Sequence, residues 1–236
     1  MEQYVECTHE YWRSNGKFVP NIVLRLASGG YIGGGLYHSQ NIEGALATLP
    51  GARIVCPSFA DDAAGLLRTA MRSRGFTLYL EPKALYNSVE ASSVVPEEFE
   101  VPFGKARIRR EGTDLSMITY GNTTHFCLNV AERLAQEGWS VEVIDLRSLI
   151  PLDKETIYAS VKKTSKALVV HEDKVFSGFG AEIAAGIGTE LFRYLDAPVQ
   201  RVGSVFTPVG FHPILEKAIL PTEDKIYDAA RTLLEY

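Results

Sequence analysis

The sequence lacks the features that mark several whole classes of protein. Its 236 residues contain only three cysteines, Cys7, Cys56 and Cys127, which stand far apart and form no CxxC pair. They predict reduced thiols in a cytoplasmic compartment and exclude a disulfide framework or a cysteine-based zinc site. No stretch approaches the roughly 20 apolar residues that a membrane-spanning helix needs. The first residues also lack the basic flank and apolar run of a signal peptide.

An excess of charge of one sign is missing as well. The net charge is −5, and acidic and basic residues are mixed along the chain. No basic face suggests nucleic acid, and no polybasic block suggests an anionic membrane surface. With 46% hydrophobic and 22% charged residues, the composition is that of a globular protein. The length suits one large domain or two of about 100 residues each.

Nucleotide-binding signatures are absent although glycine is concentrated in one segment, residues 28–35, which we call the glycine loop. It reads Ser-Gly-Gly-Tyr-Ile-Gly-Gly-Gly and contains neither GxGxxG nor GxxxxGK[ST]. This spacing excludes the dinucleotide and P-loop types of site. The glycines still indicate unusual dihedrals or a close backbone approach, as in a tight crossover beneath another chain or in a functional loop.

Two blocks of alternating strands and helices are visible, the N-terminal block (residues 1–90) and the C-terminal block (residues 113–236). In the N-terminal block, residues 7–12 have a helical pattern, and Ser58 is placed to cap the helix that follows Pro57. Short apolar runs predict its strands, at 21–25, 53–56 and 77–80. In the C-terminal block the predicted strands are 115–120, 141–145, 167–171 and 199–202, and the helices are 122–137, 153–163, 178–193 and 222–235. This α/β order predicts a mostly parallel sheet with helices on both faces.

The stretch between the blocks has no periodic pattern. Residues 88–112 carry two prolines and two glycines among acidic residues. We interpret them as a long surface connection, with the linker proper at residues 91–112.

His38 is the histidine of greatest interest, because it follows the glycine loop directly. A histidine at a loop edge can titrate near neutral pH and can transfer protons. Taken alone, however, such a histidine is more often structural than catalytic. Ser39 beside it has no nucleophile-elbow sequence around it, which excludes a serine hydrolase of that type.

Other polar residues have plainer interpretations. His171-Glu172-Asp173 ends a predicted parallel strand, where ligands often bind, but no HExxH or matching pair supports a metal. We expect a turn there whose acidic residues cap the next segment. Asp145 and Arg147 are expected to form a structural salt bridge or an interface contact, and His212 is expected to pack. The residues alone indicate a two-block α/β protein with one notable histidine.

The order of many short motifs resembles that of the β subunits of 2-oxo acid dehydrogenases, the pyruvate and branched-chain enzymes. Each motif is weak alone, but their order and spacing together are specific. They are Ile22-Val-Leu-Arg25, His38-Ser-Gln40, Pro50-Gly51, Asp62-Ala63, Leu80-Glu-Pro-Lys83, Gly104-Lys-Ala106, Glu142-Val-Ile-Asp-Leu-Arg147, Pro151-Leu-Asp153, His171-Glu172, Gly180-Ala-Glu182 and Asp196-Ala-Pro198.

The resemblance implies a fold and partners. Residues 1–90 would be the last part of a transketolase-like pyrimidine-binding domain, and residues 113–236 a transketolase C-terminal domain. About 100 residues that the family has at the start would be absent, including the glutamate that contacts the cofactor's aminopyrimidine ring. The family binds thiamine diphosphate and magnesium at an interface with an α subunit or α half. It decarboxylates a 2-oxo acid and transfers the acyl group to a lipoyl arm. The C-terminal domain builds the contact between two β chains and helps to dock the lipoyl acyltransferase core.

Residue by residue, the resemblance assigns one catalytic role. His38 would reach into the shared site as a proton donor or electrostatic partner, and Ser39 and Gln40 would orient its loop. No cofactor contact is assigned to this chain. The family's potassium site would correspond to carbonyls and side chains of Ile22, Ala70, Met71, Ser73 and Gly75. Ser73 replaces the usual acid and Gly75 the usual amide, which argues against that site. Leu80-Glu-Pro-Lys83 and His171-Glu172 favour the branched-chain enzymes over the pyruvate enzymes.

Three hypotheses remain open at this point. The chain is part of an enzyme and inactive alone, or it is a non-catalytic module kept for assembly and docking. The third is another transketolase-superfamily enzyme, such as a deoxyxylulose phosphate synthase. The first predicts activity that depends on His38, the second predicts assembly that does not, and parallel substrate assays would separate the third.

Overall fold

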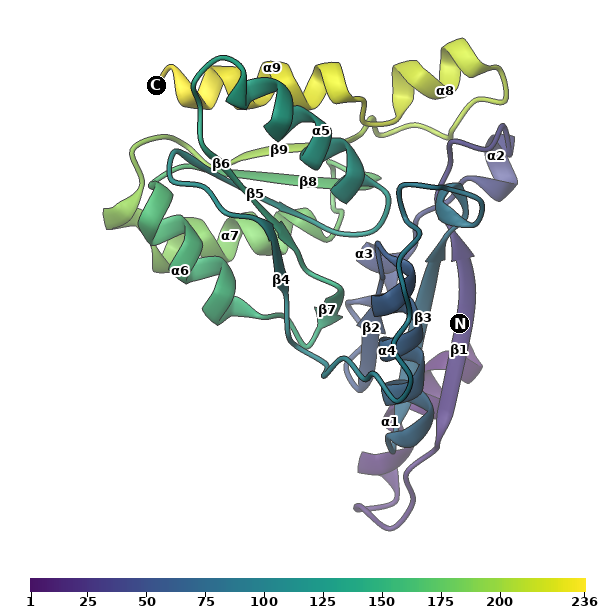
Figure 1. The fold of residues 1–236 in the computed structure, drawn as a ribbon. Helices are drawn as coiled ribbons and strands as arrows, with labels where there is room; N and C mark the ends of the chain where they lie inside the picture. Colours follow the sequence, from purple (N-terminus) through teal and green to yellow (C-terminus); the bar gives the residue numbers. More distant parts are fainter.

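A computed structural model describes residues 1–236 as two twisted sheets that meet along one side (Figure 1). The first sheet has four strands in the order β1-β3-β2-β7, and the second has five in the order β4-β6-β5-β8-β9. Helices cover both faces of the second sheet, with α5 and α9 on one side and α6 and α7 on the other. The predicted α/β class is confirmed, with parallel pairing in the central strands of both sheets.

The N-terminal block forms most of the first sheet. Its apolar runs become strands where expected, and the helix predicted around residues 7–12 is α1. Its elements are α1 (Glu2–Arg13), β1 (Ile22–Ser28), α2 (Gly35–His38), α3 (Glu43–Leu46), β2 (Ala52–Val55), α4 (Ala60–Arg72), β3 (Phe76–Pro82) and the 3-10 turn η1 (Lys83–Leu85). Strand β3 lies between β1 and β2, so that its side chains are almost wholly buried.

The C-terminal block follows the predicted alternation and adds elements that the pattern did not reveal. Its elements are β5 (Leu115–Thr119), α5 (Thr123–Ala135), β6 (Val141–Asp145), β7 (Ser148–Ile150), α6 (Lys154–Thr164), β8 (Ala167–Lys174), α7 (Gly180–Glu190), the 3-10 turn η2 (Phe192–Tyr194), β9 (Gln200–Ser204), α8 (Pro213–Ile219) and α9 (Glu223–Leu234). The turn expected at His171 is wrong, since β8 continues through Lys174. His212 does not pack in the interior, because it is exposed and its Nδ1 accepts the Ile214 amide at the start of α8.

Two short strands tie the blocks together. Strand β7, from the C-terminal block, pairs antiparallel with β2 of the first sheet. Strand β4 (Arg107–Arg110) lies within the stretch predicted to be a linker and pairs antiparallel with β6. Three or four residues are too short for a periodic pattern, which explains why the sequence did not reveal either strand.

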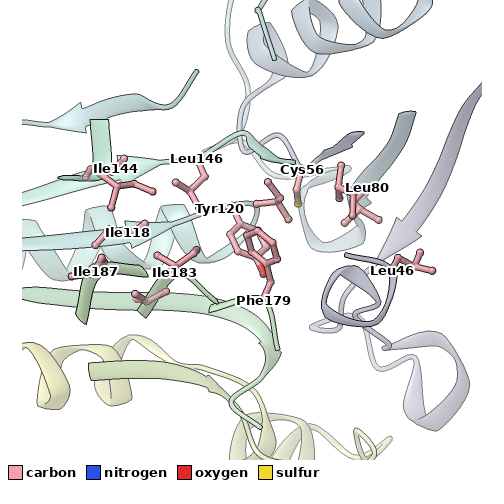
Figure 2. Packing of buried hydrophobic residues seen from close by; sticks show 14 of the residues in the cluster. Leu46, Cys56, Leu80, Ile118, Tyr120, Ile144, Leu146, Phe179, Ile183 and Ile187 are labelled. Atoms are coloured by element: carbon pink, nitrogen blue, oxygen red, sulfur yellow. The ribbon is translucent and has the colours of Figure 1, made fainter. Parts of the chain in front are cut away.

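A continuous hydrophobic core also joins the blocks. Leu46, Cys56 and Leu80 of the first block share one cluster with Ile118 and Ile183 of the second. Figure 2 shows Tyr120 and Phe179 lying between the two sets. A separate cluster fills the far face of the second sheet, beneath α5 and α9. The blocks are therefore held in a defined relative position, which fixes any site that lies between them.

None of the helices combines the length and the apolar character that crossing a membrane would require.

Candidate functional site

The glycine loop runs from the carboxyl end of β1 into the short helix α2, which ends at His38. Ligands commonly bind at the carboxyl ends of parallel strands in an open α/β sheet. The His38 side chain is exposed at this end, as are Leu36 and Tyr37 on the same turn. The loop needs glycine at Gly29, whose φ is +86° and where a Cβ would lie 2.6 Å from Glu172 Oε1.

The residues after His38 tie its loop to the sheet. Gln40 donates from Nε2 to the Leu36 carbonyl at 2.6 Å, and the Gln40 carbonyl accepts the Gly29 amide at 3.0 Å. Lys83, at the end of β3, donates to the His38 carbonyl. Ser39 is fully buried, and its Oγ has no hydrogen-bond partner. Gln40 therefore holds the backbone around His38, as a loop-orienting residue would.

The C-terminal block holds the same loop from the other side. The Gly30 amide donates to Glu172 Oε1 on β8, and the Gly33 amide donates to Glu216 Oε1 on α8 at 3.3 Å. Tyr31 Oη donates to the Pro221 carbonyl at 2.8 Å. In Figure 1, α2 and α8 accordingly lie beside one another although they are far apart in the sequence. The position of His38 thus depends on both blocks.

Three carboxyl groups lie buried behind the loop, and we call Glu43, Glu172 and Asp173 the acidic cluster. Glu43 accepts from Tyr120 Oη at 3.0 Å, and Asp173 accepts the Gly44 amide at 3.2 Å. Burial, followed by the nearby Asp173 charge, raises the pKa of Glu43 to about 8. Burial raises the pKa of Glu172 to about 7, against the opposing effect of the Gly30 amide, and it also raises the pKa of Asp173. No arginine pairs with these three groups.

His171 contributes packing and no visible chemistry. It is fully buried, and neither ring nitrogen has a hydrogen-bond partner. Burial lowers its pKa to about 4, so the ring is neutral near pH 7. Gly180 leaves room for the ring, since a Cβ there would lie 2.2 Å from His171 Nε2. The close approach of α7 to β8 therefore depends on a glycine at this position.

Exposed apolar side chains lie on α2 and on the segment that leads into α8. Tyr37 is 86% exposed, Phe211 74% and Ile214 73%. A Cβ on Gly35 of α2 would lie 3.5 Å from the Phe211 ring, which brings α2 and the segment before α8 into one surface. Large exposed apolar groups on adjoining segments are typical of a surface that another molecule covers.

A second group of buried charges also lies where the two blocks meet, and we call Asp62, Arg109, Asp145 and Arg147 the ion-pair cluster. Arg109 pairs with Asp145 at 2.7 Å and also with Asp62, and Arg147 pairs with Asp62 at 2.7 Å. The predicted direct bridge between Asp145 and Arg147 is wrong, because each pairs with a residue farther away in the sequence.

Ser58 belongs to this junction and does not cap α4. The N-cap of α4 is Phe59, without a side-chain cap, whereas Ser58 Oγ donates to Asp145 Oδ1 at 2.9 Å. The serine is drawn inward by the buried carboxylate of the C-terminal block, a contact that spacing along the chain could not reveal.

The residues named for a potassium site lie near the turn from α4 to β3. The Gly75 carbonyl accepts the Ile22 amide at 3.3 Å, and the Ala70 carbonyl accepts the Ser73 amide at 3.3 Å. Ser73 Oγ donates to the Thr69 carbonyl at 2.6 Å, and Met71 is exposed. Carbonyl oxygens have a second lone pair, so these bonds do not forbid a cation, and potassium here stays a prediction. No group of three or more His, Cys, Asp and Glu side chains is arranged to hold a metal ion.

Sequence reasoning named His38, Ser39 and Gln40 but missed the supporting residues Glu43, Lys83 and Glu216. Lys83 lies in the motif Leu80-Glu-Pro-Lys83, which was noticed only for its resemblance to the family. Glu43 and Glu216 carry no local signal, because their contacts are made across the junction.

Two family models match the chain. The transketolase pyrimidine-binding domain matches residues 10–89, and the transketolase C-terminal domain matches residues 104–226. Among solved structures, a chain described as "Split gene transketolase, inactive beta4 tetramer" superimposes with a TM-score of 0.72. The match covers 98% of this chain and 74% of that one at 22% identity, which shows a shared fold.

Curated relatives are more similar in sequence. The 2-oxoisovalerate dehydrogenase subunit beta of Bacillus subtilis is 40% identical over 95% of this chain and 69% of its own length. The pyruvate dehydrogenase E1 component subunit beta of the same organism is 39% identical over the same shares. A mitochondrial pyruvate dehydrogenase E1 subunit beta-1 of Arabidopsis thaliana is 40% identical over 93% of this chain and 61% of its own length. The chain therefore belongs to the family of 2-oxo acid dehydrogenase E1 β subunits, built from transketolase-type pyrimidine-binding and C-terminal domains.

Proposed function

We propose that this chain supplies part of the β side of a 2-oxo acid dehydrogenase E1 component and that His38 is its catalytic residue. The observation that carries the proposal is 40% identity over 95% of the chain to a 2-oxo acid dehydrogenase β subunit, together with an exposed His38 on a loop held from both blocks. The complete reaction is the oxidative decarboxylation of a 2-oxo acid and transfer of its acyl group to a lipoyl arm. The chain alone is inactive in this proposal.

The residues around His38 fit one wall of a shared thiamine diphosphate site. An exposed imidazole stands among exposed apolar groups, Leu36 and Tyr37, which suit contact with a partner that completes the site. This chain offers no cluster for the magnesium ion, which in the proposal is bound with the diphosphate by an α subunit or α half. When bound, thiamine diphosphate supplies the electron sink for decarboxylation.

His38 contributes proton transfer or charge. An imidazole can hold a proton at one ring nitrogen and donate it to substrate or lipoyl oxygen or sulfur near neutral pH. Gln40 and Lys83 fix the backbone on either side of the ring through the Leu36 and His38 carbonyls. Gln40 is supported as an orienting residue by these bonds, the role of Ser39 rests on the family resemblance alone, and only His38 is proposed to touch reacting groups.

The proposed partners follow from the same assignment. They are an α subunit or α half, a lipoyl acyltransferase core, and a second β chain that contacts the C-terminal domain at residues 113–236. Residues 1–90 act as the pyrimidine-binding part, and residues 91–112 connect the two. The compartment is proposed to be cytoplasmic.

The 2-oxo acid is either a branched-chain acid or pyruvate. The two Bacillus subtilis relatives are 40% and 39% identical, so that overall identity does not separate them. Leu80-Glu-Pro-Lys83 and His171-Glu172 favour the branched-chain acid. Both acids therefore belong in the assay.

The test is reduction of an artificial electron acceptor, driven by each 2-oxo acid. It compares the chain alone with the chain combined with an α subunit and the N-terminal segment of a β relative. We expect turnover only in the combined sample. His38→Ala in the combined sample tests the catalytic residue, and His9→Ala, on α1, is its matched histidine control. Full assembly without any turnover in the presence of either acid would favour a docking module.

A further inference from the structure

The loop that carries His38 is anchored to the opposite block by a buried carboxyl group with no role in the family comparison. We propose that Glu172 is the positioning residue of the site and that it makes the placement of His38 dependent on pH. This inference rests on the proposed role of His38. It assigns a positioning role and a mode of regulation to a residue of the C-terminal block.

The contact has the geometry of a specific anchor. Glu172 Oε1 accepts the Gly30 amide, and a Cβ on the preceding Gly29 would lie only 2.6 Å from the same oxygen. The loop therefore approaches this carboxyl group as closely as a backbone can. Glu172 is itself held in β8, where its carbonyl accepts from Ser204 Oγ on β9. A carboxyl group on β8 of the second sheet thus fixes the start of the loop.

Neighbouring contacts restrain the loop but do not replace this anchor. Lys174, two residues along β8, donates to Gln40 Oε1 at 3.3 Å, and Glu216 accepts the Gly33 amide at 3.3 Å. Both contacts are longer and more exposed than that of Glu172. Tyr31 Oη also donates to the Pro221 carbonyl at 2.8 Å, but the Gly30 amide has Glu172 as its acceptor. Loss of Glu172 would therefore loosen the loop at Gly30, upstream of α2 and His38.

The surroundings of Glu172 make the anchor sensitive to protons. The titratable groups that face it are Tyr31, Glu43, Cys56, Lys83, Lys174 and Glu216. Burial outweighs the two lysines and raises the pKa of Glu172 to about 7 from its ordinary 4.5. Because the pKa of Glu172 is raised while the loop is anchored, the protonated acid favours the anchored loop. The anchoring is then lost as pH rises through about 7, where the ionised carboxylate favours a hydrated, detached loop.

The test measures amide hydrogen exchange of residues 29–33 in the full chain, expressed as protection relative to the intrinsic rate. In the wild type, we expect protection to fall as pH rises from about 5.5 to about 8. Glu172→Gln mimics the neutral acid and keeps an acceptor oxygen. In this variant the amide protection of residues 29–33 should therefore not vary between about pH 5.5 and about 8. At about pH 8 it should exceed wild type by at least about threefold.

Glu172→Ala removes the acceptor, and protection should fall about tenfold at about pH 6. The matched control is Asp114→Asn, because Asp114 accepts the Ser140 amide at 2.7 Å away from the loop. That variant should leave residues 29–33 unchanged. The inference is overturned if Glu172→Ala leaves loop protection unchanged, or if Glu172→Gln keeps the pH dependence of the wild type. The glutamine variant decides the matter even if the alanine variant fails to fold.

Activity of the combined enzyme separates this inference from the proposed function. Glu172→Gln should flatten the pH profile of kcat between about pH 5.5 and about 8, whereas Glu172→Ala should lower kcat with its loosened loop. If His38→Ala stays fully active while Glu172→Ala loosens the loop, the catalytic role of His38 fails and the anchor stands. If His38→Ala is inactive while the loop of Glu172→Ala is unchanged, the anchor fails and the catalytic role stands.

Discussion

The ion-pair cluster and the acidic cluster join the same two blocks in opposite ways. In the ion-pair cluster, the buried carboxylates of Asp62 and Asp145 face the guanidinium groups of Arg109 and Arg147. In the acidic cluster, Glu43 and Glu172 are held by a tyrosine hydroxyl and backbone amides, without an arginine. Burial raises the pKa of Asp145 as well, but the Arg109 charge opposes that rise.

The difference indicates a division of roles between the two clusters. Each buried carboxylate of the ion-pair cluster faces a guanidinium group, and removing one partner of such a pair is costly, so the cluster is suited to hold the blocks in place. Carboxyl groups with pKa values of about 7 and about 8 change protonation near neutral pH. The acidic cluster adjoins the His38 loop, where such a change can affect function.

The largest expected effect comes from removing a cation from the ion-pair cluster. Arg109→Met leaves the buried Asp62 and Asp145 without their shared partner, and should lower the free energy of unfolding by about 3 kcal/mol or more. Urea denaturation measures the change. The matched control is Arg110→Met on the same strand, whose partner Glu132 is 66% exposed, and it should cost less than about 1 kcal/mol. Equal effects of the two variants would contradict the structural role of the cluster.

A smaller loss should follow from disturbing the packing beside the acidic cluster. Gly180→Ala would place a Cβ 2.2 Å from His171 Nε2, and the strain should cost about 2 kcal/mol. Thermal unfolding provides the measurement. Gly188→Ala is the control on the same helix, because a Cβ there meets nothing within 4 Å, and alanine should stabilise the helix slightly. If Gly180→Ala were as stable as Gly188→Ala, the account of the close approach between α7 and β8 would be wrong.

The third prediction tests the direction in which ionisation of the acidic cluster changes stability. The pKa of Glu43 is raised from 4.5 to about 8 in the folded state, so its contribution to stability is complete below about pH 4.5 and is lost as pH rises through about 8. Glu43→Gln should therefore raise the free energy of unfolding at about pH 8.5 by about 1 kcal/mol or more and reduce its fall with pH. Urea denaturation at several pH values measures this. If Glu43→Gln were less stable than wild type at high pH and kept the wild-type dependence of the free energy of unfolding on pH, the raised pKa assigned to Glu43 would be contradicted.

The smallest effect is expected at the outer contact of the glycine loop. Glu216 accepts the Gly33 amide at 3.3 Å near solvent, so Glu216→Gln should change stability by at most about 0.5 kcal/mol. At each pH between about 6 and 8, amide protection at Gly33 in this variant, measured by nuclear magnetic resonance, should be close to that of the wild type. A loss of protection across the whole loop would shift the anchoring role from Glu172 to Glu216.

Local signals allowed prediction of the long elements and of His38. Short apolar stretches predicted β1, β2, β3, β5, β6, β8 and β9, and the His38-Ser-Gln40 motif drew attention to the loop. Strands β4 and β7 were missed because they are too short for a periodic pattern and pair with strands distant in the sequence. Ser58, Asp145 and Arg147 were assigned local partners, whereas burial at the junction gives them distant ones. Contacts made only after the blocks dock leave no periodic trace in the sequence.

The catalytic role of His38 is tested most directly by the rate of 2-oxo acid decarboxylation in the combined enzyme, with an artificial electron acceptor and His38→Ala beside wild type. General acid–base groups contribute about 100-fold or more to rates. We expect at least that loss of kcat in His38→Ala, with assembly intact and His9→Ala at the wild-type rate. A His38→Ala enzyme that assembles and turns over at the wild-type rate would contradict this role.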